Sequence, residues 1–393
     1  MSAARELIDA TDTYIIPSYG QRVLAAERGE GARLWDADGK EYIDFFAGFG
    51  GAGIGGHCHP KIADAVQCQA RTLWCHGNFF TSRPQVDLAR RIVENGFGGK
   101  VFFGHSGADA VEAALKLVRR VAGDGRYKII SFHGCFHGRS MGALSLTPEK
   151  YQAGFEPMLP GNVKADYGDL DSVAALIDDE TAGVFVEPIQ GEGGVNVPDA
   201  SFLKGLRTLC DERGLVLVCD EVWTGPARTG RWYAHQHFGI EPDVMTLAKA
   251  LGGGAPISAC VASPKYADVL SPGTHASTMG GNPLCAAGGV AAMDLIAEEG
   301  LVDRAAEKGA WLCRTLREAQ IGCVREVRGH GMLIGIELDA GVEARPLFLE
   351  AMQRGLLIGY AQTNVLRLAP PLITPDDLLD RGVGMLVDLL RSA

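Results

Sequence analysis

Three short apolar runs, each followed by polar or glycine-rich sequence, constrain the fold of this 393-residue chain most strongly. Continuous apolar runs bounded in this way are typical of buried parallel strands, and the loops at their carboxyl ends are expected to carry function. Ligands of open α/β sheets bind at this edge. The runs lie within residues 181–194, 214–230 and 242–256, and they lead to Glu187, to Asp220 and Glu221, and to Lys249.

Lys249 stands in an apolar segment, where a lone lysine is costly unless it is paired or chemically modified. Burial lowers the pKa of a lysine, and a neutral amine is a nucleophile towards carbonyl carbon. A helix lysine whose ammonium reaches water is the structural alternative. Asp220 favours the chemical interpretation, because pyridoxal phosphate commonly uses an aspartate at its pyridine nitrogen and a lysine for covalent attachment. A helix cap or a loop ion pair would also explain Asp220.

The segments DEVWTGPARTG (residues 220–230) and TLAKALGGG (residues 246–254) resemble the signature of class III aminotransferases of the acetylornithine and ornithine type. These are pyridoxal-phosphate enzymes of fold type I, and further motifs follow in the family's order from Tyr19 to Arg367. The resemblance implies an α/β fold with a large, mostly parallel-sheet domain and a small domain formed by both termini. We expect the large cofactor-binding domain at residues 46–288 and the small domain at residues 1–45 and 289–393.

The sequence SGADAVEAALKL, which follows an expected strand at residues 100–103, predicts a helix with Ser106 near its N-cap. Free N–H groups at a helix N-terminus suit a phosphate, although a well-capped helix need not bind anything. The run resembles the family's phosphate-binding segment, which implies that Ser106, Gly107 and Ala108 hold the phosphate of the cofactor. Three neighbouring positions depart from the family pattern and leave the side-chain contacts open: His105, Asp109 and Val111.

A second motif, FHGR at residues 136–139, matches the family's aromatic-His-Gly-Arg sequence. An aromatic ring stacks well on a flat heterocycle, and the match implies that Phe136 and His137 belong to the cofactor site. Arg139 resembles the arginine that clamps a substrate carboxylate, a task suited to the bidentate guanidinium, although an ordinary surface arginine would fit too. Trp223 stands where the family usually has a cofactor-contacting glutamine. Because indole donates but does not accept hydrogen bonds, we expect altered cofactor electronics or substrate choice.

Four further positions match family residues that contact the substrate or the neighbouring subunit. Glu192 resembles a glutamate that pairs with Arg367 while a neutral or cationic ω-chain is bound and releases it for a dicarboxylate, although each residue would also fit an ordinary ion pair. Tyr19 matches a tyrosine at the distal end of the substrate, and a core aromatic residue is an equally good explanation. Thr278 matches a threonine that reaches the phosphate of the neighbouring subunit, which implies a homodimer with shared active sites. An unremarkable loop threonine is the alternative.

The resemblance therefore implies an aminotransferase that moves the ω-amino group of an acetylornithine-like donor to 2-oxoglutarate, giving a semialdehyde and glutamate. Lys249 is expected to bind pyridoxal 5'-phosphate covalently and then to move the proton, and Asp220 is expected to keep the pyridine ring charged. Ornithine, 4-aminobutyrate and succinyl-diaminopimelate aminotransferases share these motifs. A pyridoxal-phosphate aminomutase, which needs no external acceptor, and a non-enzymatic cofactor-binding relative are the remaining alternatives.

Charge and composition argue against several other classes of protein. The net charge of −11, without a basic cluster, disfavours nucleic-acid binding. No run reaches the roughly 18 apolar residues of a membrane helix, and the N-terminus lacks the apolar core of a signal peptide. Ten scattered cysteines without a CxxC pair suit reduced thiols, so we expect a cytoplasmic enzyme without membrane or nucleic-acid partners.

The sequence GAGIGG at residues 51–56 fits a dinucleotide-binding GxGxxG pattern, but neither a helix within the motif nor an acid about 20 residues later follows it. His57, Cys58 and His59 suggest zinc, yet adjacent residues do not converge on one metal from regular structure. We therefore expect a structural turn here and no metal site.

Overall fold

In the computed structural model, which describes residues 1–123 and 125–392, the three apolar runs form adjacent parallel strands. They are β7 (Thr181–Val186), β8 (Val216–Asp220) and β9 (Val244–Leu247). Every residue of these strands is buried, which explains why the sequence is continuously apolar instead of alternating. The strand prediction is confirmed, and the segments that follow the three strands meet at one edge of the sheet.

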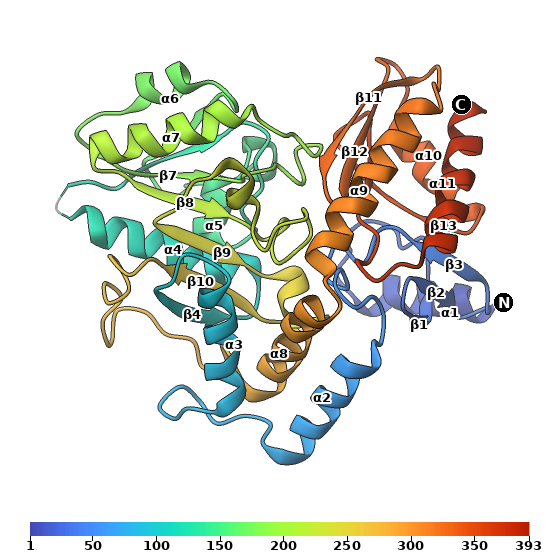
Figure 1. Ribbon diagram of the computed structural model, residues 1–393, viewed down its shortest axis with the longest axis horizontal. Helices are drawn as coiled ribbons and strands as arrows, with labels where there is room; N and C mark the ends of the chain where they lie inside the picture. Colours follow the sequence, from blue (N-terminus) through green and yellow to red (C-terminus); the bar gives the residue numbers. More distant parts are fainter. Residues whose placement is uncertain (124, 393) are drawn as a thin grey trace.

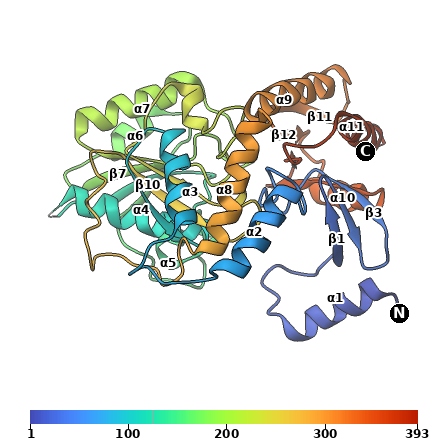
Figure 2. The same cartoon turned by 60° about the horizontal axis from the view of Figure 1, so that its bottom comes forward.

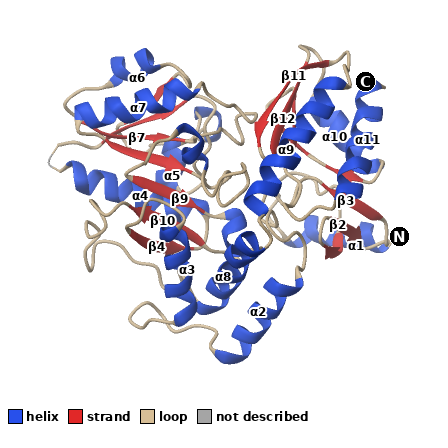
Figure 3. Ribbon diagram, in the orientation of Figure 1, coloured by secondary structure: helices blue, strands red, loops and turns tan. Residues whose placement is uncertain are grey.

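These strands form the middle of a seven-stranded sheet with the order β4-β10-β9-β8-β7-β5-β6. The pairs from β9 to β6 are all parallel, and β10 runs antiparallel to both of its neighbours. Figure 3 shows this sheet surrounded by helices, as expected for a large α/β unit. The remaining strands of the sheet are β4 (Lys100–Gly104), β5 (Lys128–Phe132), β6 (Asn162–Ala165) and β10 (Ser258–Ala262).

Helices cover both faces of the large sheet, because successive strand residues point to opposite sides. In β5, Ile129 packs into the core beneath α4 (Gly107–Ala122), whereas Ile130 packs into the core beneath α7 (Ala200–Arg213). The parallel strands are thus buried on both faces, as the sequence predicts.

A smaller part of the molecule is built from both ends of the chain (Figure 1). Near the N-terminus, β3 (Glu41–Asp44) pairs in parallel with β13 (Leu356–Leu357), which confirms that the two termini share a structural unit. One four-stranded sheet has the order β1-β2-β3-β13, and the other has the order β11-β12-β15-β14. Their other strands are β1 (Ala26–Glu30), β2 (Arg33–Asp36), β11 (Val324–His330), β12 (Leu333–Leu338), β14 (Gly359–Ala361) and β15 (Val365–Leu368).

Two long helices, α8 (Pro283–Glu298) and α9 (Leu301–Glu318), lead from the large sheet to the smaller part (Figure 1). The expected domain boundary at residue 288 falls within α8, and the domain ranges stay a prediction. In Figure 2, α1 (Ala3–Tyr14) lies at the outer edge, and none of its residues is buried. The other α-helices are α2 (Pro60–Thr72), α3 (Arg83–Glu94), α5 (Met141–Leu146), α6 (Leu170–Leu176), α10 (Ala344–Gln353) and α11 (Asp376–Arg391).

No helix in the described ranges is both long and apolar enough to cross a membrane.

Candidate active site

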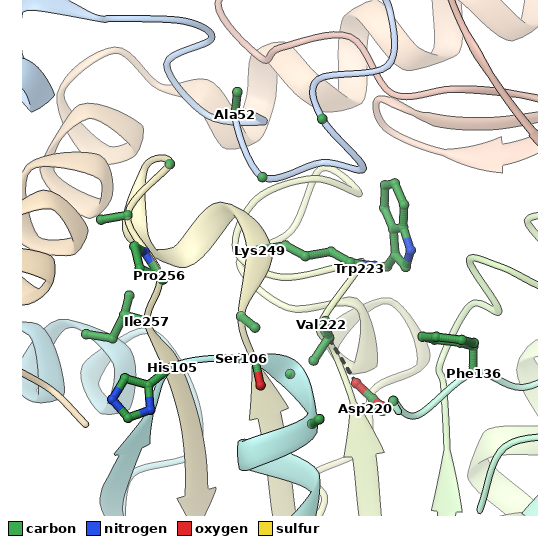
Figure 4. A pocket seen from close by; sticks show the side chains of 18 of the residues that line it. Ala52, His105, Ser106, Phe136, Asp220, Val222, Trp223, Lys249, Pro256 and Ile257 are labelled. Carbon is green, nitrogen blue, oxygen red and sulfur yellow. Dashed lines mark hydrogen bonds between the residues drawn. The ribbon is translucent and has the colours of Figure 1, made fainter. Parts of the chain in front are cut away.

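A cavity of about 620 Å³ lies at the carboxyl edge of the large sheet. The ends of β8 and β9, the first turn of α4 and the loop after β5 supply its walls, and the glycine-rich loop after β3 closes it from the N-terminal side (Figure 4). The cavity brings together all of the predicted cofactor residues except Thr278. These are Ser106, Gly107, Ala108, Phe136, His137, Asp220, Trp223 and Lys249.

Lys249 lies two residues after the end of β9 and points its side chain into this cavity (Figure 4). Its φ of +44° is uncommon for a residue with a Cβ, and such backbone strain concentrates at functional sites. The Nζ atom lies 3.8 Å from the centre of the Trp223 ring. Burial lowers the pKa of the amine to about 7, although the nearby Glu192 carboxylate favours the charged form. The amine is therefore a nucleophile near neutral pH, and its head does not extend to the outer surface.

Asp220 ends β8 and is held by donors on three sides. Its Oδ2 lies 2.7 Å from Nδ1 of His137, and its Oδ1 accepts hydrogen bonds from the Thr246 hydroxyl at 3.0 Å and the Val222 N–H at 3.1 Å. Burial disfavours the imidazolium, but Cys135 and Asp220 outweigh it and raise the pKa of His137 to about 10. The three donors therefore fix the direction of the Asp220 carboxylate. The sequence identifies His137 only through its motif and gives no sign of this partnership.

The first turn of α4 presents backbone donors to the cavity. Ser106 is the N-cap, as predicted, and its hydroxyl accepts from the Asp109 N–H at 3.3 Å. The Asp109 carboxylate accepts in return from the N–H groups of Ser106, at 3.1 Å, and His105, at 2.9 Å. Gly107 and Ala108 follow in the first turn, where N–H groups have no acceptor within the helix. Asp109, one of the departures from the family pattern, thus stabilises the turn and leaves these two donors facing the cavity.

Beyond Trp223, the structure brings Glu192 and Arg367 into contact. The Glu192 Oε1 lies 3.1 Å from Nη1 of Arg367 and 3.0 Å from Nε1 of Trp223. Arg367, on β15, is 1% exposed and also donates to the Gly191 carbonyl at 3.0 Å. Burial opposes ionisation of Glu192, but Arg367 and Lys249 lower its pKa on balance. An ion pair between a buried arginine and a partly buried glutamate therefore lies directly behind the indole that faces Lys249.

Arg139 lies outside the Lys249 cavity, close to Phe136. Its guanidinium centre is 4.2 Å from the Tyr151 ring and 5.4 Å from the Phe136 ring. No carboxylate of the described residues pairs with it. Tyr151 and Glu192 also line a second cavity of about 510 Å³. The exposed guanidinium is thus available to an incoming anion.

Tyr19 and Thr278 do not reach the Lys249 cavity. Tyr19 is 80% exposed, and its ring stacks under Arg22 at 5.1 Å. Thr278 is exposed and lines a separate hollow of about 880 Å³ together with Phe79 and Phe80. The roles expected for these two residues stay predictions.

The segment at residues 51–56 is a loop, and the next helix, α2, starts only at Pro60. Nε2 of His57 pairs with the Asp44 carboxylate at 2.7 Å, and Cys58 is exposed. Across residues 1–123 and 125–392, no cluster of three or more histidine, cysteine or acidic side chains is arranged to hold a metal.

Glu187 is a site residue whose role the sequence left undefined. Its two carboxylate oxygens accept from the Phe136 N–H at 2.8 Å and the Gly191 N–H at 2.9 Å. Burial is the largest influence and raises the pKa of Glu187 to about 7. The carboxyl group fixes the loop that carries Phe136 to the loop that carries Glu192.

The sequence did not point to Arg228 as a functional residue, although it lies in the DEVWTGPARTG motif. It is 2% exposed and donates to the carbonyl oxygens of Gly53, at 3.0 Å, Met332, at 3.1 Å, and Pro370, at 2.5 Å. An arginine among small residues is the only local signal, and it does not reveal acceptors so distant in the chain.

The Aminotransferase class-III family profile matches residues 14–390. The chain belongs to the class III aminotransferase family. Among its relatives, this aminotransferase is 42% identical to the acetylornithine aminotransferase of Caldanaerobacter subterraneus subsp. tengcongensis over 386 residues, which is 96% of this chain and 98% of the relative. It is 43% identical to that of Methanopyrus kandleri over 394 residues, 99% of each chain.

Solved structures agree with this assignment. The ornithine aminotransferase of Toxoplasma gondii superposes on this aminotransferase with a TM-score of 0.94 at 34% identity, covering 100% of this chain and 96% of the other. The acetylornithine aminotransferase of Elizabethkingia anophelis has a TM-score of 0.87 at 32% identity, and 99% of each chain is covered. These likenesses confirm the predicted fold type and the pyridoxal-phosphate chemistry of the family.

The cavity of this class III aminotransferase fits pyridoxal 5'-phosphate. The Asp220 carboxylate suits a protonated pyridine nitrogen, and the Lys249 amine suits the aldehyde carbon. The N–H groups of Gly107 and Ala108 suit the phosphate. One cavity therefore supplies all three kinds of partner that the cofactor requires.

Proposed function

We propose that this enzyme transfers the ω-amino group of an acetylornithine-like donor to 2-oxoglutarate, giving a semialdehyde and glutamate. The observation that carries the proposal is the Glu192–Arg367 pair, 3.1 Å apart, behind the wall of the Lys249 cavity. A site that must accept both a neutral ω-chain and a dicarboxylate needs a cation that pairs with a carboxylate of the protein for the first substrate and is released for the second. The acetylornithine aminotransferases that share about 42% identity with the chain support this choice of donor.

In this proposal, Lys249 and Asp220 are the catalytic residues. The bound cofactor supplies an electron sink for the carbon that carries the donor's amino group. The Lys249 Nζ removes the proton from this carbon and later returns a proton, for which a pKa of about 7 is well suited. Asp220, oriented by His137, holds the ring nitrogen protonated.

The other residues that line the Lys249 cavity supply the remaining cofactor contacts. Ser106, Gly107 and Ala108 bind the phosphate through the α4 N-terminus, and Phe136 lies against the ring of the cofactor. Trp223 lines the same cavity in place of the family's usual glutamine.

For substrates, Arg139 binds the carboxylate that the donor and acceptor share. Arg367 binds the second carboxylate of 2-oxoglutarate once Glu192 moves away. Tyr19 contacts the distal end of the donor. The free, exposed guanidinium of Arg139 and the buried one of Arg367 support this division.

We also propose a homodimer with shared sites, in which Thr278 reaches the phosphate bound by the neighbouring subunit. The hollow beside Thr278, with the exposed rings of Phe79 and Phe80, supports this arrangement. A cytoplasmic location is supported by the ten cysteines, all of which are free thiols.

A visible absorption spectrum of the purified enzyme tests the proposal. N-acetylornithine, added without acceptor, should bleach the band of the lysine-bound cofactor, and 2-oxoglutarate should restore it. If ornithine or 4-aminobutyrate bleaches the band and N-acetylornithine does not, that compound is the amino donor. Turnover without any acceptor would favour an aminomutase. A protein that shows no band after cofactor is supplied would contradict the role of Lys249.

A further inference from the structure

The indole of Trp223 contacts two basic groups of the site, Lys249 and Arg367. Its ring centre is 3.8 Å from the Nζ of Lys249 and 4.4 Å from the guanidinium carbon of Arg367. Figure 4 shows the Lys249 side chain directed at this ring. Cations are attracted to an aromatic face, so the ring stabilises the Arg367 guanidinium and also the Lys249 amine when it is protonated.

Two glycines make the space that the indole fills. A Cβ at Gly50 would lie 2.9 Å from the Cζ3 of Trp223, and one at Gly191 would lie 2.5 Å from its Cδ1. Both distances are shorter than ordinary contacts. The ring is 7% exposed and is therefore fixed in position by the backbone on two sides.

From this fixed ring, the indole N–H reaches Glu192. It donates to Oε1 at 3.0 Å, and Arg367 donates to the same oxygen from 3.1 Å. The Nη2 of Arg367 is buried without a hydrogen-bond partner in the part of the chain that the structure describes. To expose Arg367 to a dicarboxylate, Glu192 must give up a second, immobile donor besides the arginine.

We infer that Trp223 is a specificity-determining residue that latches Glu192 over Arg367 and so disfavours a dicarboxylate relative to a neutral ω-chain. The inference rests on the proposed function, because it concerns the pocket that both substrates share. The glutamine usual at this position in the family has a flexible amide that both donates and accepts, whereas an indole only donates. Moving Glu192 away from Arg367 therefore requires more free energy in this chain than in a family member with glutamine at this position.

The test compares Trp223→Phe with the wild-type enzyme, both carrying cofactor. Phenylalanine keeps an aromatic face beside Lys249 and Arg367 and removes only the N–H donor and part of the ring. Calorimetric titration with glutarate, an unreactive dicarboxylate, and with pentanoate, a monocarboxylate of equal length, measures the preference without turnover. We expect Trp223→Phe to bind glutarate about 10- to 100-fold more tightly, as for loss of one hydrogen bond to a charged acceptor, with pentanoate little changed.

A double-mutant cycle shows whether the effect passes through Glu192. In a Glu192→Ala background, Trp223→Phe should leave the affinity for glutarate unchanged, since the latched group is gone. Trp311→Phe, on α9 outside the cavity, controls for the loss of an indole. Weaker or equal glutarate binding by Trp223→Phe, or the same gain without Glu192, would overturn the inference. The proposed function fails separately, if 2-oxoglutarate does not restore the visible band of the wild-type enzyme.

Discussion

At the scale of single residues, the chemistry of the site depends on the lowered pKa of the Lys249 amine. An exposed lysine is protonated at neutral pH and cannot attack an aldehyde, but burial brings this amine from its usual pKa of 10.5 to about 7. The folded protein without cofactor thus binds fewer protons than the unfolded chain between these values. Within that window, Lys249 makes the free energy of unfolding increase as the pH rises.

The first prediction concerns the rate at which cofactor-stripped protein captures pyridoxal phosphate. Because only the neutral amine reacts, the rate of appearance of the visible band should rise with pH, with a midpoint near the pKa of about 7. Stopped-flow absorbance over a pH series measures this midpoint. A midpoint above about 9, closer to that of an ordinary lysine, would show that the pocket does not depress the pKa.

The second prediction separates covalent attachment from binding. Lys249→Ala should lower kcat by at least roughly 10⁴-fold, because both the nucleophile and the proton carrier are lost. It should still bind the cofactor non-covalently, since Asp220 and the α4 N-terminus remain. Equilibrium dialysis and steady-state kinetics measure the two properties, with the exposed Lys265→Ala as the control. Turnover at the wild-type rate would remove Lys249 from the mechanism.

At the scale of secondary-structure elements, much of the site could be predicted from local sequence. Their continuous apolar runs predict the burial of β7, β8 and β9, and its capping residues predict where α4 begins. Contacts between distant segments leave no such pattern. The space that Gly50 provides for Trp223 and the three carbonyls that Arg228 binds depend on how loops pack, so only the structure reveals them.

The third prediction tests the α4 N-terminus. Ser106→Ala should lower the free energy of unfolding by about 1 kcal/mol through loss of the cap, and it should also weaken cofactor binding. Asp199→Ala is the matched control, because Asp199 caps α7 through the Ser201 N–H at 2.8 Å, outside the cavity. Thermal unfolding with and without cofactor separates the effects. An equal change in cofactor affinity for both variants would argue against phosphate binding at Ser106.

At the scale of the whole molecule, Arg228 ties three segments together around the cavity. It joins the glycine-rich loop after β3, through Gly53, to the start of β12 and the end of β15. Burial lowers the pKa of the guanidinium to about 10, so the group stays charged at neutral pH and depends on these carbonyls for solvation.

The fourth prediction is that Arg228→Met destabilises the protein by about 3–5 kcal/mol, since three buried carbonyl groups each lose one donor. Urea unfolding of the cofactor-free protein measures the loss. Arg228→Lys should recover part of it, because an ammonium reaches some of the same acceptors. A loss below about 1 kcal/mol for Arg228→Met would mean that water replaces the guanidinium.

The last prediction concerns assembly. Phe79 is fully exposed and Phe80 is 71% exposed beside the hollow that Thr278 lines, and clustered apolar surface of this kind is typical of interaction sites, of which we expect a subunit interface here. Light scattering should give twice the chain mass of 41.8 kDa. Replacing both phenylalanines by aspartate should yield monomers that have lost activity, because charges would be buried at the interface and Thr278 would no longer reach its neighbour's cofactor. Phe155→Asp alters a phenylalanine that is also exposed but lies outside this hollow, and it should leave the dimer intact. A fully active wild-type monomer would contradict the shared site, and the Lys249 cavity would then have to work with the residues of one chain alone.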